Sequence, residues 1–356
     1  MASKAYYDVL DGLRGTAAIV ILVYHFMEMI YPDYSDNFVG HGFLAVDFFF
    51  CLSGFVIGFA YDNRIKTIGI KEFFINRLIR LHVLVVSGSI VGLAGFVFNP
   101  FVDGMAAGWG SILLAFTGSI LLIPTPFLPH RWDALFPYNS PAWSLFLEYI
   151  VNILYAMVIC RIKKNALLAV GIMCAGWLMY TAYKAGWMIG GWDIKTFADG
   201  FPRVAYSFTA GLLVFRYGWV LNNKLGFIFP FILLMSVFLF PHVENDLLTE
   251  ALTVILVFPL IISIGAGTNV NGKMKQFCVF IGRLSYPLYM THITTVWIFG
   301  DYYNKVKPCG MELFTIVACL CLFNLAFACF IMRLYDEPLR AWLTRKRKRN
   351  RQAGIG

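Results

Sequence analysis

The fold is decided by residues 10–59, which begin LDGLRGTAAIVILVYHF (10–26) and, after a short polar loop, continue GHGFLAVDFFFCLSGFVIGF (40–59). These two long apolar runs carry three groups that are poorly soluble in lipid: Arg14, His25 and Asp47. Ionisable side chains inside membrane spans are costly and rare, so each of the three is a candidate functional residue. Arg14 and His25 are eleven positions apart. This is close to three helical turns, so we expect both on one helix face, roughly 16 Å apart along the axis.

Composition extends this reading to the whole chain. Of its 356 residues 59% are hydrophobic and only 14% are charged, whereas a soluble domain carries about 25% charged residues. We therefore predict an all-α polytopic membrane protein with about ten transmembrane helices. The predicted spans are residues 13–31, 43–61, 79–98, 142–160, 165–185, 202–219, 225–241, 250–266, 277–299 and 311–333.

An eleventh apolar stretch near residues 110–124 is predicted to be a re-entrant or interfacial segment. It lies within a long, proline-rich connection at residues 99–141, and prolines interrupt helices. If residues 110–124 do not span, 23 of the 29 Lys and Arg residues fall on the side of the N-terminus. Cytoplasmic loops carry such an excess of positive charge. We therefore expect both termini in the cytoplasm, in a bacterial inner membrane.

Apolar runs fill the chain, so we expect one integral-membrane domain over residues 1–340 and a basic cytoplasmic tail over 341–356. The tail has the charge of a nucleic-acid ligand, but in a membrane protein it is better explained by contact with anionic lipid headgroups. Seven of the eight cysteines lie in apolar runs and no CxxC pair occurs. Such cysteines usually serve packing, so neither a disulfide framework nor a metal site is expected.

Four ionisable residues on four predicted spans fall at similar depth. With a rise of 1.5 Å per residue, His25, Asp47, Glu148 and His292 each lie roughly 6 to 10 Å below the outer boundary. Because a charge that faces lipid costs several kcal/mol, we expect all four to converge on protein or on a wet cavity. A histidine that merely satisfies a structural hydrogen bond is the alternative for His25 or His292 taken alone.

Helical spacing adds neighbours to three of these residues. The three predicted stripes are Asp47, Cys51, Gly54 and Gly58; Ser144, Glu148 and Tyr155; and Ser285, Tyr289 and His292. Residues three, four, seven or eleven apart share one helix face, so each stripe is a candidate wall of the site. Small residues also permit close helix packing, which is the alternative explanation for Gly54 and Gly58.

A basic cluster lies at the predicted cytoplasmic side. Arg77 and Arg80 are three positions apart in FFINRLIRL (73–81), near the inner end of the span that carries Arg14. Paired guanidinium groups suit a phosphate, although such residues can equally serve as positive membrane anchors. A basic cluster at the cytoplasmic side, together with His and carboxylate groups nearer the outer side, suits a phosphorylated donor that enters from the cytoplasm and an acceptor that arrives from outside.

These motifs, in this order, resemble the acyltransferase-3 family of membrane O-acyltransferases, which modify surface glycans and related acceptors. The resemblance covers nearly the whole chain, and it is carried by the motifs LDGLRGTAAIVILVYH (10–25), VDFFFCLSGFVI (46–57), FFINRLIRL (73–81), PAWSLFLEYIVNILY (141–155), IGRLSYPLYMTH (281–292) and YDEPL (335–339). It implies an acyl-CoA donor, expected to be acetyl-CoA, and a single ten-helix enzyme domain.

The resemblance also implies roles for individual residues. It makes His25 the catalytic histidine and places Arg14, Arg77 and Arg80 on the donor side. Asp47 is implied as a supporting acid that would orient His25. The residues expected to bind substrate or to support the site are Ser53, Trp143, Ser144, Glu148, Tyr289 and His292.

The predicted activity is transfer of an acetyl group from cytoplasmic acetyl-CoA to a hydroxyl of a carbohydrate or glycolipid acceptor. His25 would act as general base, and a covalent acyl-histidine is the mechanistic variant. The predicted partners are the acceptor and membrane lipids, with no nucleic acid. A secondary transporter or exporter with ion-coupling groups in the membrane is the alternative function, and a membrane scaffold is a third.

Overall fold

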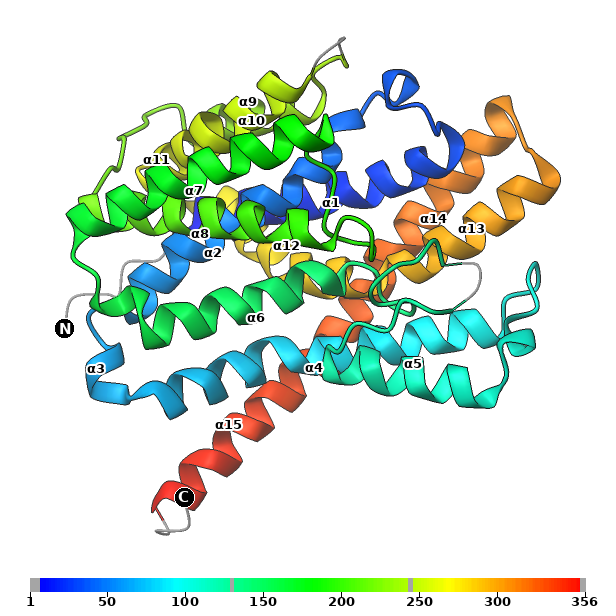
Figure 1. The fold of residues 1–356 in the computed structure, drawn as a ribbon, viewed down its shortest axis with the longest axis horizontal. Helices are drawn as coiled ribbons and strands as arrows, with labels where there is room; N and C mark the ends of the chain where they lie inside the picture. Colours follow the sequence, from blue (N-terminus) through cyan, green and yellow to red (C-terminus); the bar gives the residue numbers. More distant parts are fainter. Residues whose placement is uncertain (1–6, 129–130, 243–245, 353–356) are drawn as a thin grey trace. The chain divides into compact units, whose positions relative to one another are not determined.

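A computed structural model describes residues 7–128, 131–242 and 246–352. The two ends of the chain, which we predict to be cytoplasmic, lie outside these ranges. Within them the regular structure is helical, apart from one isolated bridge between Asn223 and Thr268. The helices group into two compact units, the first of residues 1–65 and 143–285 and the second of residues 66–142 and 286–356 (Figure 1). The all-α class predicted from composition is confirmed.

Seven helical segments of the described chain are long and apolar enough to cross a membrane. They contain α1, α2, α4, α6, α7, α10 with α11, and α14 with α15, and their bounds are Asp8–Ile30, Gly40–Tyr61, Ile70–Val97, Ala142–Arg161, Lys164–Ala185, Leu247–Ala266 and Gly310–Asn350. Each of them coincides with one of the ten predicted spans. The protein is therefore an integral membrane protein.

The other three predicted spans also fall on helices, but they differ from the prediction in detail. Residues 202–219 form α8 (Gly200–Tyr217), and residues 225–241 form α9 (Ile228–Phe238). With 11 residues, α9 is only about 16 Å long, against roughly 30 Å for a hydrocarbon core. The single helix predicted at 277–299 is instead divided into α12 (Gly272–Thr291) and α13 (Ile293–Val306), with His292 at the break.

In the first unit, α2 (Ala45–Tyr61) and α8 lie against each other with almost no space between their backbones. A β-carbon added at Gly54 would lie 2.0 Å from the carbonyl oxygen of Phe208, and one at Gly211 would lie 1.8 Å from that of Cys51. No larger residue fits at either position. The small residue at Gly54 in the α2 stripe is therefore explained by close helix packing, which is the alternative that the sequence left open.

An Asp–Arg pair fastens each end of this helix pair. Near the start of α2, Asp47 binds Arg203, and after its end Asp62 binds Arg216, whose Nε and Nη2 lie 2.8 Å from the two carboxylate oxygens. The Tyr155 hydroxyl also donates to Asp62 over 3.0 Å. Both arginines come from α8, so two charged clamps and a run of small residues together fix its register against α2.

The second unit contains the proline-rich connection. Its helix α5 (Trp109–Leu121) has 13 residues, about 20 Å, which is too short to cross a bilayer. It packs beside α4 (Ile70–Val97), as Figure 1 shows. The predicted re-entrant or interfacial segment is thus a short apolar helix.

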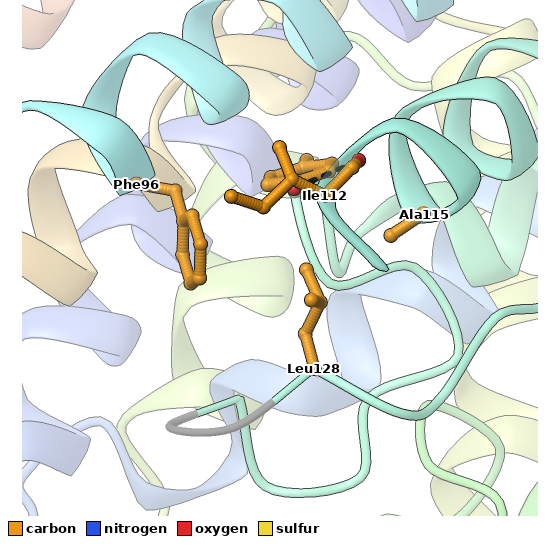
Figure 2. Close-up of a cluster of buried hydrophobic side chains, with 5 residues drawn as sticks. Phe96, Ile112, Ala115 and Leu128 are labelled. Atoms are coloured by element: carbon orange, nitrogen blue, oxygen red, sulfur yellow. Dashed lines mark hydrogen bonds between the residues drawn. The ribbon is translucent and has the colours of Figure 1, made fainter. Parts of the chain in front are cut away.

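A small apolar core joins this short helix to its surroundings (Figure 2). Its members, all buried, are Phe96, Ile112, Ala115, Leu128 and Tyr138. Tyr138 packs edge-on against Phe96 and donates its hydroxyl to the carbonyl of Ile112 over 3.2 Å. Burial raises the pKa of Tyr138 to about 12, so the phenol stays protonated and keeps this hydrogen bond. The connection at 99–141 is therefore packed structure rather than an idle loop.

The C-terminal basic residues continue the last helix. A π-helical turn at Met332–Asp336 links α14 (Gly310–Ile331) to α15 (Glu337–Gln352) without a break. Arg347 pairs with Glu72 of α4 and donates to Asn76 over 3.2 Å. Part of the predicted tail is therefore an ordered helix within the second unit.

Candidate active site

The candidate catalytic histidine lies near the end of α1 (Asp8–Ile30) and is paired with a carboxylate on the same helix. His25 Nδ1 and Glu28 Oε2 are 2.9 Å apart. The two side chains are 21% and 29% exposed, so the pair is not enclosed by the protein. A hydrogen bond from Nδ1–H to the carboxylate would leave the basic lone pair on Nε2, as in a Ser-His-Asp triad.

Two tyrosines hold Glu28 in place. The Tyr24 and Tyr34 hydroxyls each donate to Glu28 Oε1 over 3.2 Å. The other carboxylate oxygen, Oε2, is the one that faces His25. Tyr34 lies in the short helix η1 (Tyr34–Asp36), between the membrane segments. Burial, and next the charge of Glu28, raise the pKa of Tyr34 above its ordinary value, which keeps the phenol a donor. The loop after α1 thus helps to orient the carboxylate beside His25.

The structure gives Asp47 a different partner from the one we predicted. Its carboxylate receives Arg203 Nη2 at 2.6 Å and Nε at 3.1 Å. Asp47 is fully buried and Arg203 is 3% exposed. Arg203 also donates to the carbonyl of Gly190 over 2.7 Å. A buried guanidinium thus holds the Asp47 carboxylate at both oxygens, and the carboxylate that the structure places against His25 is Glu28. A role of Asp47 beside His25 stays a prediction.

Four further predicted residues lie on α2 and α6 (Ala142–Met157). The Ser53 hydroxyl donates to Glu148 Oε1 over 2.9 Å, so these two predicted residues do meet. The guanidinium of Arg203 lies 5.3 Å from the ring centre of Trp143, within range of a cation–π contact. Ser144 is buried at the start of α6. Trp143 therefore supports the Asp47–Arg203 clamp.

Arg14 is tied to neighbouring residues within the first unit. Its Nη2 lies 2.8 Å from Asp11 and donates to the carbonyl of Gly282 over 2.6 Å, while Nε donates to Ser285 over 2.9 Å. The side chain is 25% exposed. The Asp11–Arg14 pair and α12 therefore position the guanidinium while part of it stays open.

The remaining predicted residues belong to the second unit. Arg77 is 3% exposed, whereas Arg80, one turn later on α4, is exposed. His292 is fully buried, and its Nδ1 lies 3.0 Å from the carbonyl of Tyr289. The Tyr289 hydroxyl donates to the carbonyl of Pro141 over 3.4 Å. All four of these residues therefore belong to the second unit.

Comparison with known proteins decides the family. The sequence model of an acyltransferase domain matches residues 7–333, which is nearly the whole chain. This protein belongs to the acyltransferase-3 family. The resemblance read from the motifs is therefore confirmed. No solved structure matches the chain.

Curated relatives of this acyltransferase include proteins with and without a named activity. "Protein 2 in picA locus" of Rhizobium radiobacter is 34% identical over 42% of the chain and 81% of its own length. The putative peptidoglycan O-acetyltransferase YrhL of Bacillus subtilis is 25% identical over 51% of the chain. The peptidoglycan O-acetyltransferase OatA of Listeria monocytogenes is 24% identical over 62%. The chain spans only 29% and 35% of the length of the last two.

Two residues of the candidate site were missed by our reading of the sequence. Glu28 lies three positions after His25, a spacing at which helical side chains meet, so attention to pairs within one helix would have found it. Arg203 lies 156 positions after Asp47. No local pattern joins those two residues, and only the packing of α8 on α2 brings them together.

Glu28→Gln is expected to lower kcat for acyl transfer by roughly 10²-fold, because the amide keeps the shape but no longer stabilises a charged imidazole. KM and thermal stability should change little, since the side chain is partly exposed. Steady-state kinetics on the purified acyltransferase would measure the effect, with Asp36→Asn, an exposed carboxylate in the next loop, as the control. Equal kcat for Glu28→Gln and the control would exclude Glu28 from the catalytic network.

Proposed function

We propose that this membrane acyltransferase moves an acetyl group from cytoplasmic acetyl-CoA to a hydroxyl of a cell-envelope carbohydrate. The observation that supports this most directly is the His25–Glu28 pair at 2.9 Å on the first helix. The names of two curated relatives, a peptidoglycan O-acetyltransferase and a putative peptidoglycan O-acetyltransferase, favour acetyl as the group and a glycan as the acceptor. Family membership and the histidine–carboxylate pair both count against a transporter.

In the proposed reaction, Nε2 of His25 removes the proton from the acceptor hydroxyl as the oxygen attacks the thioester carbonyl carbon of the donor. The new ester bond forms, the bond from carbon to sulfur breaks, and coenzyme A leaves as the thiolate. Glu28 stabilises the imidazolium while it exists, and the proton on His25 then passes to the thiolate. Atoms and charge balance without a further reactant.

The acyl donor is proposed to bind through arginines. The 3′-phosphate and pyrophosphate of coenzyme A are strongly anionic, and guanidinium groups bind phosphate oxygens in pairs. Arg80 is exposed on α4 and suits direct contact, whereas the buried Arg77 suits a supporting position on the same helix. Arg14, partly exposed in the first unit, is the third proposed donor residue.

Other assignments are carried forward as proposals. Ser53 and Glu148 meet by a hydrogen bond and are proposed, with Ser144, Tyr289 and His292, to bind the acceptor or to support the site. Trp143 is proposed to act through Arg203. The charge asymmetry supports cytoplasmic termini in a bacterial inner membrane.

Arg80→Ala is expected to weaken coenzyme A binding about tenfold, because a charge-assisted hydrogen bond contributes about 1.5 to 3 kcal/mol. Arg80→Lys should recover little, since it lacks the planar fork. Calorimetric titration of the detergent-solubilised protein would measure both, with Lys71→Ala, another exposed basic residue of α4, as the control. If Arg80→Ala binds coenzyme A as tightly as the wild type, Arg80 does not bind the donor and serves only as a membrane anchor.

The proposed function is tested on the cell surface. Mass spectrometry of envelope glycans should show base-labile acetyl esters when the protein is present and lose them when its gene is deleted or carries His25→Ala. Membrane vesicles supplied with radiolabelled acetyl-CoA should transfer the label to the same glycans. Movement of a labelled solute without any ester formation would contradict acyl transfer and support a transporter.

A further inference from the structure

A second polar cluster lies apart from the His25–Glu28 pair. It consists of His41 in the short helix η2 (Gly40–Leu44), His242 after α9 and Asp246 at the start of α10 (Leu247–Leu252). One nitrogen from each histidine and one carboxylate oxygen all lie within 4.8 Å of one another. All three residues belong to the first unit.

Hydrogen bonding fixes the state of His41. Its Nδ1 lies 3.0 Å from the carbonyl oxygen of Phe240, which can only accept, so Nδ1 carries the proton. In a neutral ring the other nitrogen, Nε2, then carries a lone pair. That Nε2 is buried and makes no hydrogen bond to the part of the chain that the structure describes.

The lone pair of His41 faces acceptors. Asp246 Oδ2 lies 3.3 Å from Nε2 and Glu250 Oε1 lies 4.0 Å from it, while His242 Nδ1 contacts the same oxygen of Asp246. The side chains of His41, Asp246 and Glu250 are no more than 4% exposed. Several acceptors that face one another away from water repel each other unless a proton or a metal cation lies between them.

The spacing favours a metal ion as that cation. Ligand atoms about 2.1 Å from a tetrahedral zinc ion are about 3.4 Å apart, close to the 3.3 Å between His41 Nε2 and Asp246 Oδ2. Histidines that bind metals usually donate their other nitrogen to a carbonyl or carboxylate, as His41 does. Glu250 is likewise held, because its Oε2 accepts from the amide of Met188 over 2.9 Å.

We propose that His41 Nε2, His242 Nδ1 and Asp246 bind a divalent transition metal ion of the zinc class, with Glu250 as a further carboxylate beside it. This changes our expectation of a chain without a metal site. The ion would join the loop before α2 to the start of α10 and so stabilise this end of the first unit. The proposal rests on the cluster alone and does not depend on acyl transfer.

The position of the cluster also indicates which neighbouring residues a bound ion would hold in place. The rings of Tyr34 and His242 lie 6.4 Å apart between centres, and Tyr34 is one of the two tyrosines that donate to Glu28. A metal that fixes His242 would thus steady the loop that orients the catalytic pair. The ion itself would be structural, because the contact to Glu28 passes through Tyr34.

The test measures bound metal on the full chain, purified in detergent with an affinity tag that contains no histidine. Elemental mass spectrometry should find about one zinc ion per chain. His242→Gln, at the partly exposed ligand, should lower zinc affinity by at least about tenfold. Asp36→Asn and His82→Gln, which alter a carboxylate and a histidine outside the cluster, should retain the metal.

Two further measurements centre on the wild-type protein, so that the test still decides if a variant fails to fold. A chelator should lower the thermal unfolding temperature of the wild type but not that of His242→Gln. Cobalt added to the chelated protein should give the visible absorption of a tetrahedral site, which zinc then removes. Less than about a tenth of an equivalent of metal, with no uptake of zinc or cobalt, would overturn the proposal. Equal uptake by His242→Gln would overturn it as well.

Discussion

His25→Ala is expected to reduce acyl transfer by about 10²- to 10⁴-fold, equivalent to about 3 to 5 kcal/mol of activation free energy. Without an imidazole beside Glu28, no group at this position takes the hydroxyl proton in the transition state. Because His25 is partly exposed at the end of α1, its loss should not disturb packing. Expression, thermal stability and coenzyme A binding should therefore stay near the wild-type values while the rate of ester formation falls.

His292→Ala is the comparison for this variant. His292 is fully buried in the second unit, with Nδ1 close to the carbonyls of Leu288 and Tyr289, so we expect its loss to act mainly on stability. Acid-quenched protein would also be searched for an acetyl group on His25, which separates a covalent intermediate from direct transfer. An active His25→Ala together with a folded but inactive His292→Ala would show that the wrong histidine was chosen.

Asp47→Ala is expected to lower the free energy of unfolding by about 3 to 5 kcal/mol, because it leaves Arg203 as an uncompensated charge in the interior. The side chain of Arg203 is 3% exposed and already donates to Gly190, so it cannot move readily to water. Thermal unfolding in detergent micelles would show this as a large fall in the unfolding temperature. Activity of the fraction that stays folded should fall much less than in His25→Ala.

A double variant makes this prediction specific to the pair. Replacing Asp47 with Asn and Arg203 with Met removes both charges, so the double variant should be more stable than Asp47→Ala, since no charge is left buried alone. Asp36→Asn, at an exposed carboxylate of the same unit, serves as the control. A fully stable Asp47→Asn that has lost its activity would instead return Asp47 to a direct part in catalysis.

The helices of this protein could be read from the sequence because lipid imposes a simple rule. A span must be apolar over about 20 residues, and all ten predicted ranges fall on helical segments, seven of them long and apolar enough to cross a membrane. The position of Arg14 and His25 on one helix was likewise fixed by their spacing. His25–Glu28 was equally within reach, since residues three apart on a helix are neighbours wherever that helix packs.

Contacts between distant segments could not be read in this way. Asp47 lies near the start of α2, and nothing in the sequence around it indicates that its partner is Arg203 of α8. The packing of α8 on α2, permitted by Gly54 and Gly211, places Arg203 at Asp47. The same holds for His41 and His242, which lie about 200 positions apart. Apolar spacing determines where helices form, because each helix satisfies its own backbone. Which polar side chains meet is decided only when the helices pack.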